Sequence, residues 1–183
     1  MSSEGPDDEL YPLDARAWGA DWSPDGRVVY AVSLPGGANL VVHDFVEGHD
    51  TLLFDKQRSP YRQIFWNMAW SPDGKRIVFK GSTTDGKTEI GIVDARGEKF
   101  GFIRRYQGDV VPTLAWGAAT KQILFIQQNP EAQRFQLFTL DPDTKLPPKV
   151  LPVLDPLRHY ADIAYSPDGK KIVFSCQKRL PRN

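Results

Sequence analysis

The sequence predicts an all-β chain made of repeated four-stranded antiparallel sheets, and three observations support this prediction. An aromatic residue and a turn sequence recur along the 183 residues at a spacing typical of four-stranded repeats. A similar series of short apolar strands follows each recurrence. No segment keeps the period of roughly 3.6 residues that marks an amphipathic helix.

The turn sequence Trp-Ser-Pro-Asp-Gly is the clearest part of the repeat. It begins at Trp22 and Trp70, and at Tyr165 with tyrosine in place of tryptophan, while a degenerate copy at Trp116 reads Trp-Gly-Ala-Ala-Thr. The four aromatic residues are spaced by 48, 46 and 49 residues. Proline presets φ and glycine tolerates a positive φ, so Ser-Pro-Asp-Gly predicts a turn between two strands.

Further strands are predicted after each turn. The second strand carries apolar residues two positions apart, which share one face of a strand. These pairs are Val28 and Tyr30, Ile77 and Phe79, Ile123 and Phe125, and Ile172 and Phe174. The third strand ends on an aspartate that enters a turn, in segments 40–44, 90–94 and 137–141. A less regular fourth strand follows near residues 51–54, 100–104 and 149–153.

Four strands per repeat indicate the blades of a β-propeller, because a parallel β-helix has a shorter period and a sandwich does not repeat its sequence. We expect about 3.5 blades. An N-terminal arm is predicted at 1–17, with an outer strand of a preceding or closing blade near 9–13. Three blades follow at 18–64, 65–109 and 110–158, and the first two strands of a fourth blade lie at 159–183.

Closed propellers have about four to eight blades, so the ends of this array need an explanation. The chain is part of a longer propeller, or two copies join head to tail into one ring, or the chain closes alone as a strained four-blade ring. We favour the first two arrangements, the second of which is a homo-oligomer.

The repeat resembles the TolB-type propeller repeat, which also occurs in the propeller domains of prolyl oligopeptidase-like and tricorn-like peptidases. The resemblance covers about residues 8–176 and is weakest in the third copy, which lacks Ser-Pro-Asp-Gly. It implies a non-catalytic scaffold that binds a protein or peptide. The alternative is the gating propeller of a serine peptidase whose hydrolase domain lies elsewhere. The resemblance to TolB also implies a periplasmic location, although residues 1–9 do not read as an export signal.

Several kinds of chemistry are absent from the sequence. It has no Gly-x-Ser-x-Gly elbow, no phosphate-binding glycine loop and no EF-hand loop, so we expect neither catalysis nor a cofactor. The 23 basic residues balance the 23 acidic ones, which argues against a nucleic-acid partner. No apolar run approaches the roughly 18–20 residues of a membrane helix. The single cysteine, Cys176, forms no disulfide within the chain.

One segment has the residue types of a metal site, namely His43, Asp44, Glu47, His49 and Asp50. His43 aligns with Val93 and Leu140, however, and Asp44 aligns with the aspartates that end the other third strands. We therefore interpret His43 as a packed strand residue and Asp44 as a turn cap rather than as metal ligands. The remaining histidine, His159, has no predicted nucleophilic partner, so we interpret it as a rim or packing residue.

The inner strands carry the first candidate binding site. Three residues before each repeated aromatic stand Gly19, Asn67, Thr113 and Asp162. If the small residues Ala69, Ala115 and Ala164 face the propeller axis, then Asn67, Thr113 and Asp162 line the central channel. The alternative is a solvated polar ring without a ligand. A glycosidase or lyase would need paired carboxylates, and Asp162 is the only acidic candidate.

A second candidate is an aromatic group before the second inner strand. Tyr61, Phe65 and Trp66 lie close together in the sequence, next to Arg58 and Arg62. Aromatic residues and arginine are enriched at protein interfaces, so these residues are candidates for an interface. The alternative is that the three aromatic side chains are buried between blades.

Overall fold

The computed structural model describes residues 16–107, 113–129, 134–144, 146–152, 155 and 158–178. The strand expected near residues 9–13 lies outside these residues, and so does the side chain of His159. In the part of the chain that the structure describes, no helix is long and apolar enough to cross a membrane.

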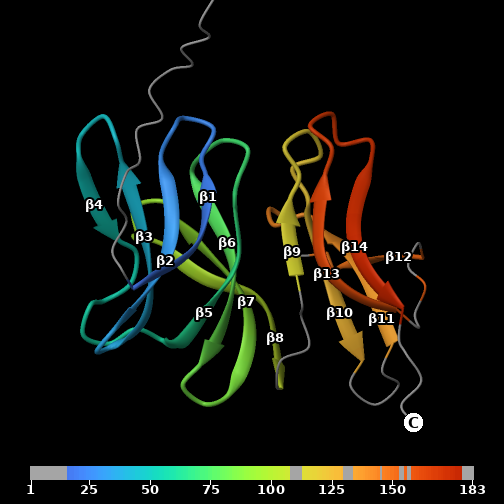
Figure 1. Cartoon of the computed structure of the whole chain (residues 1–183), viewed down its shortest axis with the longest axis horizontal. Helices are drawn as coiled ribbons and strands as arrows, with labels where there is room; N and C mark the ends of the chain where they lie inside the picture. Colours follow the sequence, from blue (N-terminus) through green and yellow to red (C-terminus); the bar gives the residue numbers. More distant parts are fainter. Residues whose placement is uncertain are drawn as a thin grey trace, which may run out of the picture.

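Every regular element in the described ranges is a β-strand, which confirms the all-β prediction (Figure 1). Three sheets have four antiparallel strands and the last has two, and in each sheet the strands follow their order in the chain. The strands are β1 (Ala17–Trp22), β2 (Val28–Leu34), β3 (Gly37–Asp44), β4 (His49–Leu52); β5 (Tyr61–Trp70), β6 (Arg76–Thr83), β7 (Lys87–Asp94), β8 (Phe100–Gln107); β9 (Thr113–Trp116), β10 (Ile123–Asn129), β11 (Arg134–Leu140), β12 (Lys149–Leu151); β13 (Arg158–Tyr165) and β14 (Ile172–Lys178).

These sheets are the blades of a partial propeller, and we call them sheets 1 to 4. Figure 1 shows sheet 1 at one end of the molecule with sheet 2 beside it, and sheets 3 and 4 overlapping at the other end. Strands β5 and β13 begin at Tyr61 and Arg158. Both therefore cross the unit boundaries expected at 64/65 and 158/159, since each inner strand continues backwards through a bulge.

The Ser-Pro-Asp-Gly turns form as their residue types require. The N–H groups of Gly26, Gly74 and Gly169 donate to the serine carbonyl three residues earlier at 3.2, 2.9 and 2.8 Å, and the glycine φ angles are 89°, 66° and 69°. In the degenerate third copy, the N–H of Lys121 donates to the Gly117 carbonyl at 2.9 Å. Lys121 itself takes a positive φ of 56°, so a non-glycine residue bears the left-handed conformation there.

Apolar clusters lie between successive sheets, and each cluster draws residues from both. Side chains of Val29 and Leu40 meet those of Ile64 and Phe79 between sheets 1 and 2. Between sheets 2 and 3 the cluster comprises Val78, Ile90, Leu114, Trp116, Ile123, Phe125 and Leu140. Between sheets 3 and 4 it comprises Leu124, Ile126, Phe135, Leu137, Tyr160 and Ile163. Neighbouring strand residues point to opposite faces, so the two central sheets are packed on both sides.

The first strand of each sheet contacts the first strand of the next. Strand β1 lies against β5, β5 against β9, and β9 against β13. Three of these inner strands have irregular register, between Trp18 and Ala20, between Ile64 and Met68, and between Tyr160 and Ile163. The inner strands therefore form one continuous row, as in a propeller whose first strands surround the axis.

Candidate functional site

Three of the four aligned positions of the predicted channel site fall at irregular parts of the inner strands. Gly19, Asn67 and Asp162 lie within the register shifts of β1, β5 and β13, and Thr113 begins β9. A bulge twists the strand and re-aims its side chains. The spacing of three residues before each aromatic therefore corresponds to a repeated backbone feature.

The structure brings only two of these residues together. The Asn67 side-chain amide nitrogen lies 3.5 Å from Thr113 Oγ1, and Thr113 is buried between the strands. The exposed Asp162 instead accepts a hydrogen bond from Ser175 Oγ on the neighbouring strand at 3.1 Å. Asn67 and Thr113 thus link sheets 2 and 3, whereas Asp162 is held within sheet 4.

Gly19 allows β1 and β5 to approach closely. A Cβ atom at Gly19 would lie 2.7 Å from the Trp66 Cα atom, and Gly19 has a φ of 57°. Beside it, Trp18 Nε1 donates to the Ile64 carbonyl at 2.7 Å. The first channel position is therefore filled by backbone and carries no ligand-binding side chain.

The three aromatic interface candidates separate into different environments. Tyr61 is completely buried, so it is a core residue and does not belong to an exposed surface. Phe65 is half-buried, with the Lys80 ammonium 3.9 Å from its ring centroid. Trp66 is exposed. The alternative of burial therefore holds for Tyr61, and Trp66 is the member of the group that a partner can reach.

The environment of Tyr61 explains its burial. Gly81 has no Cβ atom where the Tyr61 ring lies, so the ring packs against the backbone. The Tyr61 hydroxyl donates to Glu89 Oε2 at 2.9 Å, and Glu89 also pairs with Arg105. Burial and the negative charge of Glu89 raise the pKa of the Tyr61 hydroxyl. Sequence inspection missed this cluster because its members come from four different strands.

In the segment that has the residue types of a metal site, side chains make structural contacts with other residues of the chain. His43 is buried, and its Nδ1 lies 2.8 Å from Asp50 Oδ1. Asp44 Oδ1 accepts the N–H groups of Val46 and Glu47 at 2.9 and 3.0 Å, which confirms its role as a turn cap. In the ranges that the structure describes, no three metal-ligating side chains converge.

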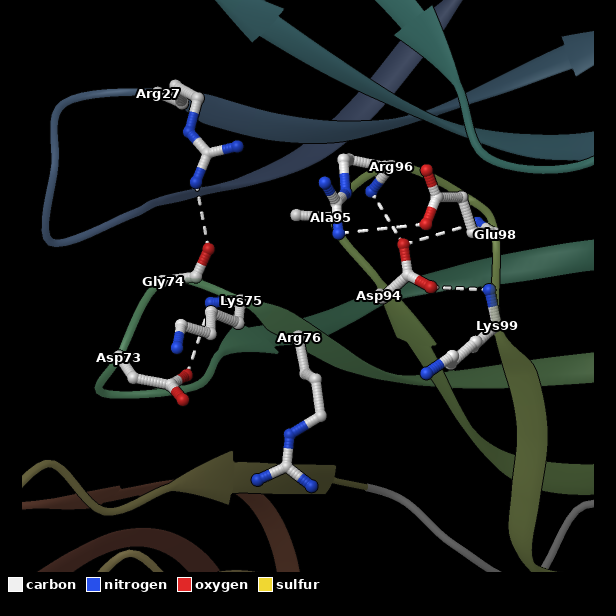
Figure 2. Close-up of a pocket in the computed structure, with 10 residues that line it drawn as sticks. All are labelled: Arg27, Asp73, Gly74, Lys75, Arg76, Asp94, Ala95, Arg96, Glu98 and Lys99. Atoms are coloured by element: carbon white, nitrogen blue, oxygen red, sulfur yellow. Dashed lines mark hydrogen bonds and ion pairs between the residues drawn. The ribbon is translucent and has the colours of Figure 1, made fainter.

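A pocket of about 500 Å³ lies where turns of sheets 1 and 2 meet (Figure 2). The turn between β1 and β2, the turn between β5 and β6, and the turn between β7 and β8 provide its walls. Its charged lining residues are Arg27, Asp73, Lys75, Arg76, Asp94, Arg96, Glu98 and Lys99. Positive residues outnumber negative ones, which sequence inspection could not detect because the residues come from three separate turns.

The pocket aspartates are engaged by their own turns. Asp73 Oδ1 accepts hydrogen bonds from Ser71 Oγ at 2.6 Å and from the Lys75 N–H at 3.1 Å, and these bonds hold the pKa of Asp73 below its usual value. Asp94 accepts the N–H groups of Arg96, Glu98 and Lys99. Partial burial acts to raise the pKa of Asp94, but these donors outweigh it and the pKa is lowered. Both carboxylates are thus turn caps that remain charged.

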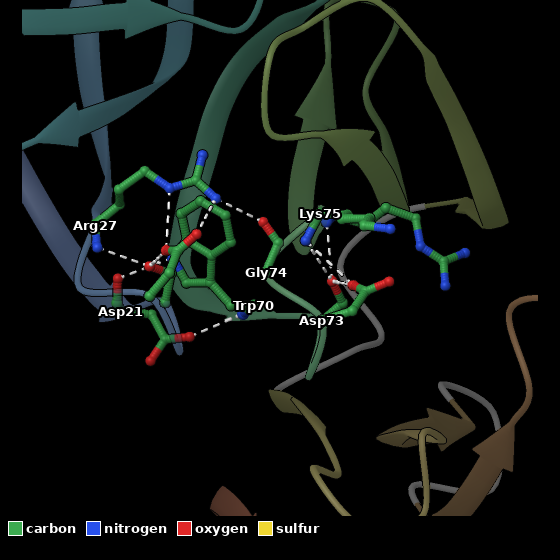
Figure 3. Close-up of polar contacts among 10 residues, drawn as sticks. Asp21, Arg27, Trp70, Asp73, Gly74 and Lys75 are labelled. Carbon is green, nitrogen blue, oxygen red and sulfur yellow. Dashed lines mark hydrogen bonds and ion pairs between the residues drawn. The ribbon is translucent and has the colours of Figure 1, made fainter.

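Two of the three pocket arginines, Arg27 and Arg76, join one sheet to the next. Arg27 pairs with Asp25 at 2.7 Å, donates to the Gly74 carbonyl at 2.8 Å and stacks 5.0 Å from the Trp70 ring centroid (Figure 3). Arg76 likewise lies 5.3 Å from the Trp116 ring centroid and pairs with Asp143 at 2.6 Å. Both guanidinium groups are therefore already used in contacts at the junctions between sheets.

Asp21 adds a further contact to the first junction (Figure 3). Its Oδ2 atom accepts the Trp70 N–H at 2.8 Å, and its carbonyl accepts Trp70 Nε1–H at 3.1 Å. Burial raises the pKa of Asp21, although the hydrogen bond from Trp70 opposes this shift. The aligned residues Ala69, Ala115 and Ala164 have no carboxylate, so this side-chain contact belongs to one junction.

Lys75 and Lys99 carry the remaining positive charge of the pocket. Both are exposed, and among the described residues no carboxylate lies within ion-pair distance of either ammonium group. Arg96 lies 3.6 Å from Glu98 and is largely exposed. The pocket can therefore receive an anionic group without displacing a structural ion pair.

No family model and no curated protein matches the chain, whereas solved structures do. TolB from Acinetobacter baumannii has a TM-score of 0.67 at 19% identity, covering 86% of this chain and 37% of that chain. A putative TolB from Agrobacterium tumefaciens has 0.68 at 19%, covering 87% and 54%. The tricorn protease has 0.65 at 16%, covering 89% and 15%. The chain thus spans less than two thirds of each of these proteins, and it has a TolB-like β-propeller fold.

Proposed function

We propose that this chain is a non-catalytic propeller scaffold that binds an acidic segment of a protein or peptide in the pocket between sheets 1 and 2. The observation that carries the proposal is the pair of exposed lysines, Lys75 and Lys99, beside carboxylates that are already used as turn caps. A carboxylate from a side chain or a chain terminus matches this arrangement, because lysine binds anions as a mobile point charge.

Two other groups are proposed to extend the contact with a protein partner. Trp66 is exposed on the inner strand β5, and large exposed aromatic rings are frequent anchors at interfaces. Asn67, Thr113 and Asp162 lie on the inner strands, and we propose that the partly exposed Asn67 and the exposed Asp162 offer polar groups to such a partner. These residues would contribute contact area, whereas the lysines would contribute attraction and orientation.

Binding of a fluorescent hexaglutamate peptide, followed by anisotropy, tests the pocket. Replacing both lysines, as Lys75→Glu with Lys99→Glu, should weaken binding at least about tenfold, because two attractive charges become repulsive. Added salt should weaken the wild-type interaction in the same direction. The matched control is Lys149→Glu with Lys170→Glu, which makes the same change of net charge outside the pocket. Equal losses in both double variants, or unchanged binding in the pocket variant, would refute the proposal.

The second candidate function is the propeller segment of a serine peptidase. The likeness to the tricorn protease favours it, and the same fold serves both roles. A gating propeller should accept peptides regardless of charge, so a hexalysine peptide would then bind as well as hexaglutamate. A hydrolase domain in the reading frame next to this segment would also support the gate over the scaffold.

A further inference from the structure

Backbone contacts fix the two turns that carry the pocket lysines, Lys75 and Lys99. The Ala95 N–H donates to the Lys75 carbonyl at 2.8 Å, which joins the turn between β7 and β8 to the turn between β5 and β6. In the turn that carries Lys99, Gly97 lies so close to sheet 1 that a Cβ atom there would be 2.8 Å from the Leu53 carbonyl oxygen. The lysine backbones are therefore held in place without a ligand, and such preorganisation lowers the cost of binding.

The lining of the pocket carries a surplus of two positive charges, because five of its residues are basic and three are acidic (Figure 2). Arg27 and Arg76 are engaged at the junctions between sheets. The ammonium groups of Lys75 and Lys99 instead face the pocket without an ion pair to any residue in the described ranges. A ligand with one negative charge would compensate one lysine, whereas a dianion attracts both about twice as strongly.

The walls of the pocket restrict the side chain that can carry this dianion. Among the described residues that line the pocket, Gly74 and Ala95 are the only uncharged ones. No aromatic ring or long aliphatic side chain of these residues forms a wall. A short side chain places its charge between the lysines with little apolar surface, whereas a phosphotyrosine ring would gain no apolar contact there.

We propose that the pocket recognises the phosphoryl group of a phosphoserine or phosphothreonine in a peptide segment of a partner protein. This inference rests on the proposed function and names the acidic group that the pocket prefers. A phosphoryl group carries about −1.5 to −2 charges at pH 7 and three acceptor oxygens. The Lys75 and Lys99 ammonium groups donate to separate oxygens from their two turns. A carboxylate offers one charge and two oxygens, so it is held less tightly.

Three peptides that differ at one position test this preference. Fluorescent Gly-Gly-X-Gly-Gly peptides, blocked at both ends, carry phosphoserine, glutamate or serine in the middle, and anisotropy gives their dissociation constants. Phosphoserine should bind at least about tenfold more tightly than glutamate, because its second charge interacts with both lysines. Serine should bind most weakly of the three.

The pH dependence provides a second signature of the phosphoryl group. Between about pH 7.5 and pH 5.5 the phosphoryl group gains a proton, since its second pKa is about 6, whereas a glutamate with a pKa of about 4.3 stays charged. Phosphoserine binding should therefore weaken about threefold in acid, and glutamate binding should change less. Asp73 and Asp94, whose pKa values are lowered, stay charged in this range. Glu98 and the five basic residues of the lining act on both peptides, so the difference between the peptides reports the phosphoryl group.

Single lysine variants test the shared contact. Lys75→Gln and Lys99→Gln should each weaken phosphoserine binding about tenfold and glutamate binding about threefold, so each should reduce the preference. Lys170→Gln is the matched control, because Lys170 follows Ser-Pro-Asp-Gly as Lys75 does, is exposed and lies outside the pocket lining. It should bind all three peptides as the wild type does. Circular dichroism of each variant would show that the fold is retained.

Competition with inorganic phosphate separates a phosphorylated peptide from a free phosphate ion. The ion should bind about tenfold or more weakly than the phosphoserine peptide, because the peptide backbone adds contacts with the turns. Equal affinities would assign the pocket to a small phosphate ligand and overturn the proposal. If hexaglutamate binds but phosphoserine binds no more tightly than glutamate, this inference fails while the proposed function stands. If hexaglutamate does not bind and the phosphoserine peptide does, the proposed preference for acidic segments fails instead.

Discussion

At the scale of single residues, Lys121 bears a conformation that glycine holds in the other turns. A left-handed non-glycine residue costs about 1–2 kcal/mol, and the larger freedom of glycine in the unfolded chain offsets part of this. Lys121→Gly should therefore raise the free energy of unfolding by about 0.5–1 kcal/mol. Urea titration measures the change. Lys75→Gly, one turn earlier at the aligned position without a positive φ, should give no such gain.

Tyr61 is a second residue whose contribution to stability can be predicted. Tyr61→Phe removes the donor to Glu89 and leaves a buried carboxylate oxygen with one partner fewer. We expect the free energy of unfolding to fall by about 1–3 kcal/mol. Tyr165→Phe is the control, because Tyr165 is only partly buried, and it should change stability by less. Equal effects in both variants would contradict the importance of the Tyr61–Glu89 bond.

The turn aspartates determine the response to acid. The hydrogen bond from Arg27 lowers the pKa of Asp25 to about 2, below its ordinary value of 3.8, and hydrogen bonds from the turn serines lower those of Asp73 and Asp168. Groups with a lowered pKa stabilise the fold above their unfolded pKa and lose this contribution as pH falls through the folded pKa. Stability should therefore decline between about pH 4 and pH 2. In Asp25→Asn the decline should be shallower in acid urea titrations, and an unchanged slope would count against this origin.

At the scale of strands and sheets, the repeated turn sequence predicts the structure better than the less regular parts of each repeat do. Proline, glycine and the alternating apolar residues determine the turns and second strands locally, so these were predictable at Trp22 and Trp70. The fourth strands were less so, and β4 begins and ends two residues before the expected segment. Edge strands have fewer packing constraints on their residues, so their pattern is weaker.

Sheet 4 should be the most easily opened element. Its two strands pack on sheet 3 through partly buried side chains such as Ile172 and Phe174, while Val173 is exposed. Local opening is easiest where few apolar groups are buried. Amide hydrogens of β14 should exchange with deuterium faster than those of β6, by a factor that mass spectrometry can measure. Equal protection would indicate that the second face of sheet 4 is covered.

At the scale of the whole molecule, the junctions between sheets hold the array together. Trp70 is buried under Arg27, so Trp70→Ala should lower the free energy of unfolding by about 3–5 kcal/mol. Trp22 has the same place in its repeat but is exposed, so Trp22→Ala should change the stability of the dilute monomer by less than about 1 kcal/mol. Chemical denaturation of both variants at low concentration makes the comparison. Similar losses would show that exposure does not govern the energy of this position.

The binding pocket was harder to predict than the fold. The alignment that gave Asn67, Thr113 and Asp162 found the bulges at Asn67 and Asp162 because they recur with the repeat, whereas Thr113 begins β9, whose register is regular. The pocket around Lys75 and Lys99 depends instead on how turns of two sheets meet, and nothing in one repeat records that contact. Tyr61 was misplaced as a surface candidate because the space above Gly81 is visible only in three dimensions.

The carboxylate of Asp21 has a consequence for assembly during folding. Similar repeats can stack in the wrong order, a known hazard of tandem proteins. Asp21 stands where the later repeats have alanine, and it alone among these four aligned residues offers an acceptor to the main chain of the following tryptophan. A misordered stack that separates Asp21 from Trp70 would leave the half-buried carboxylate of Asp21 without the hydrogen bond from the Trp70 N–H. This one side chain therefore marks which repeat comes first and which must follow it.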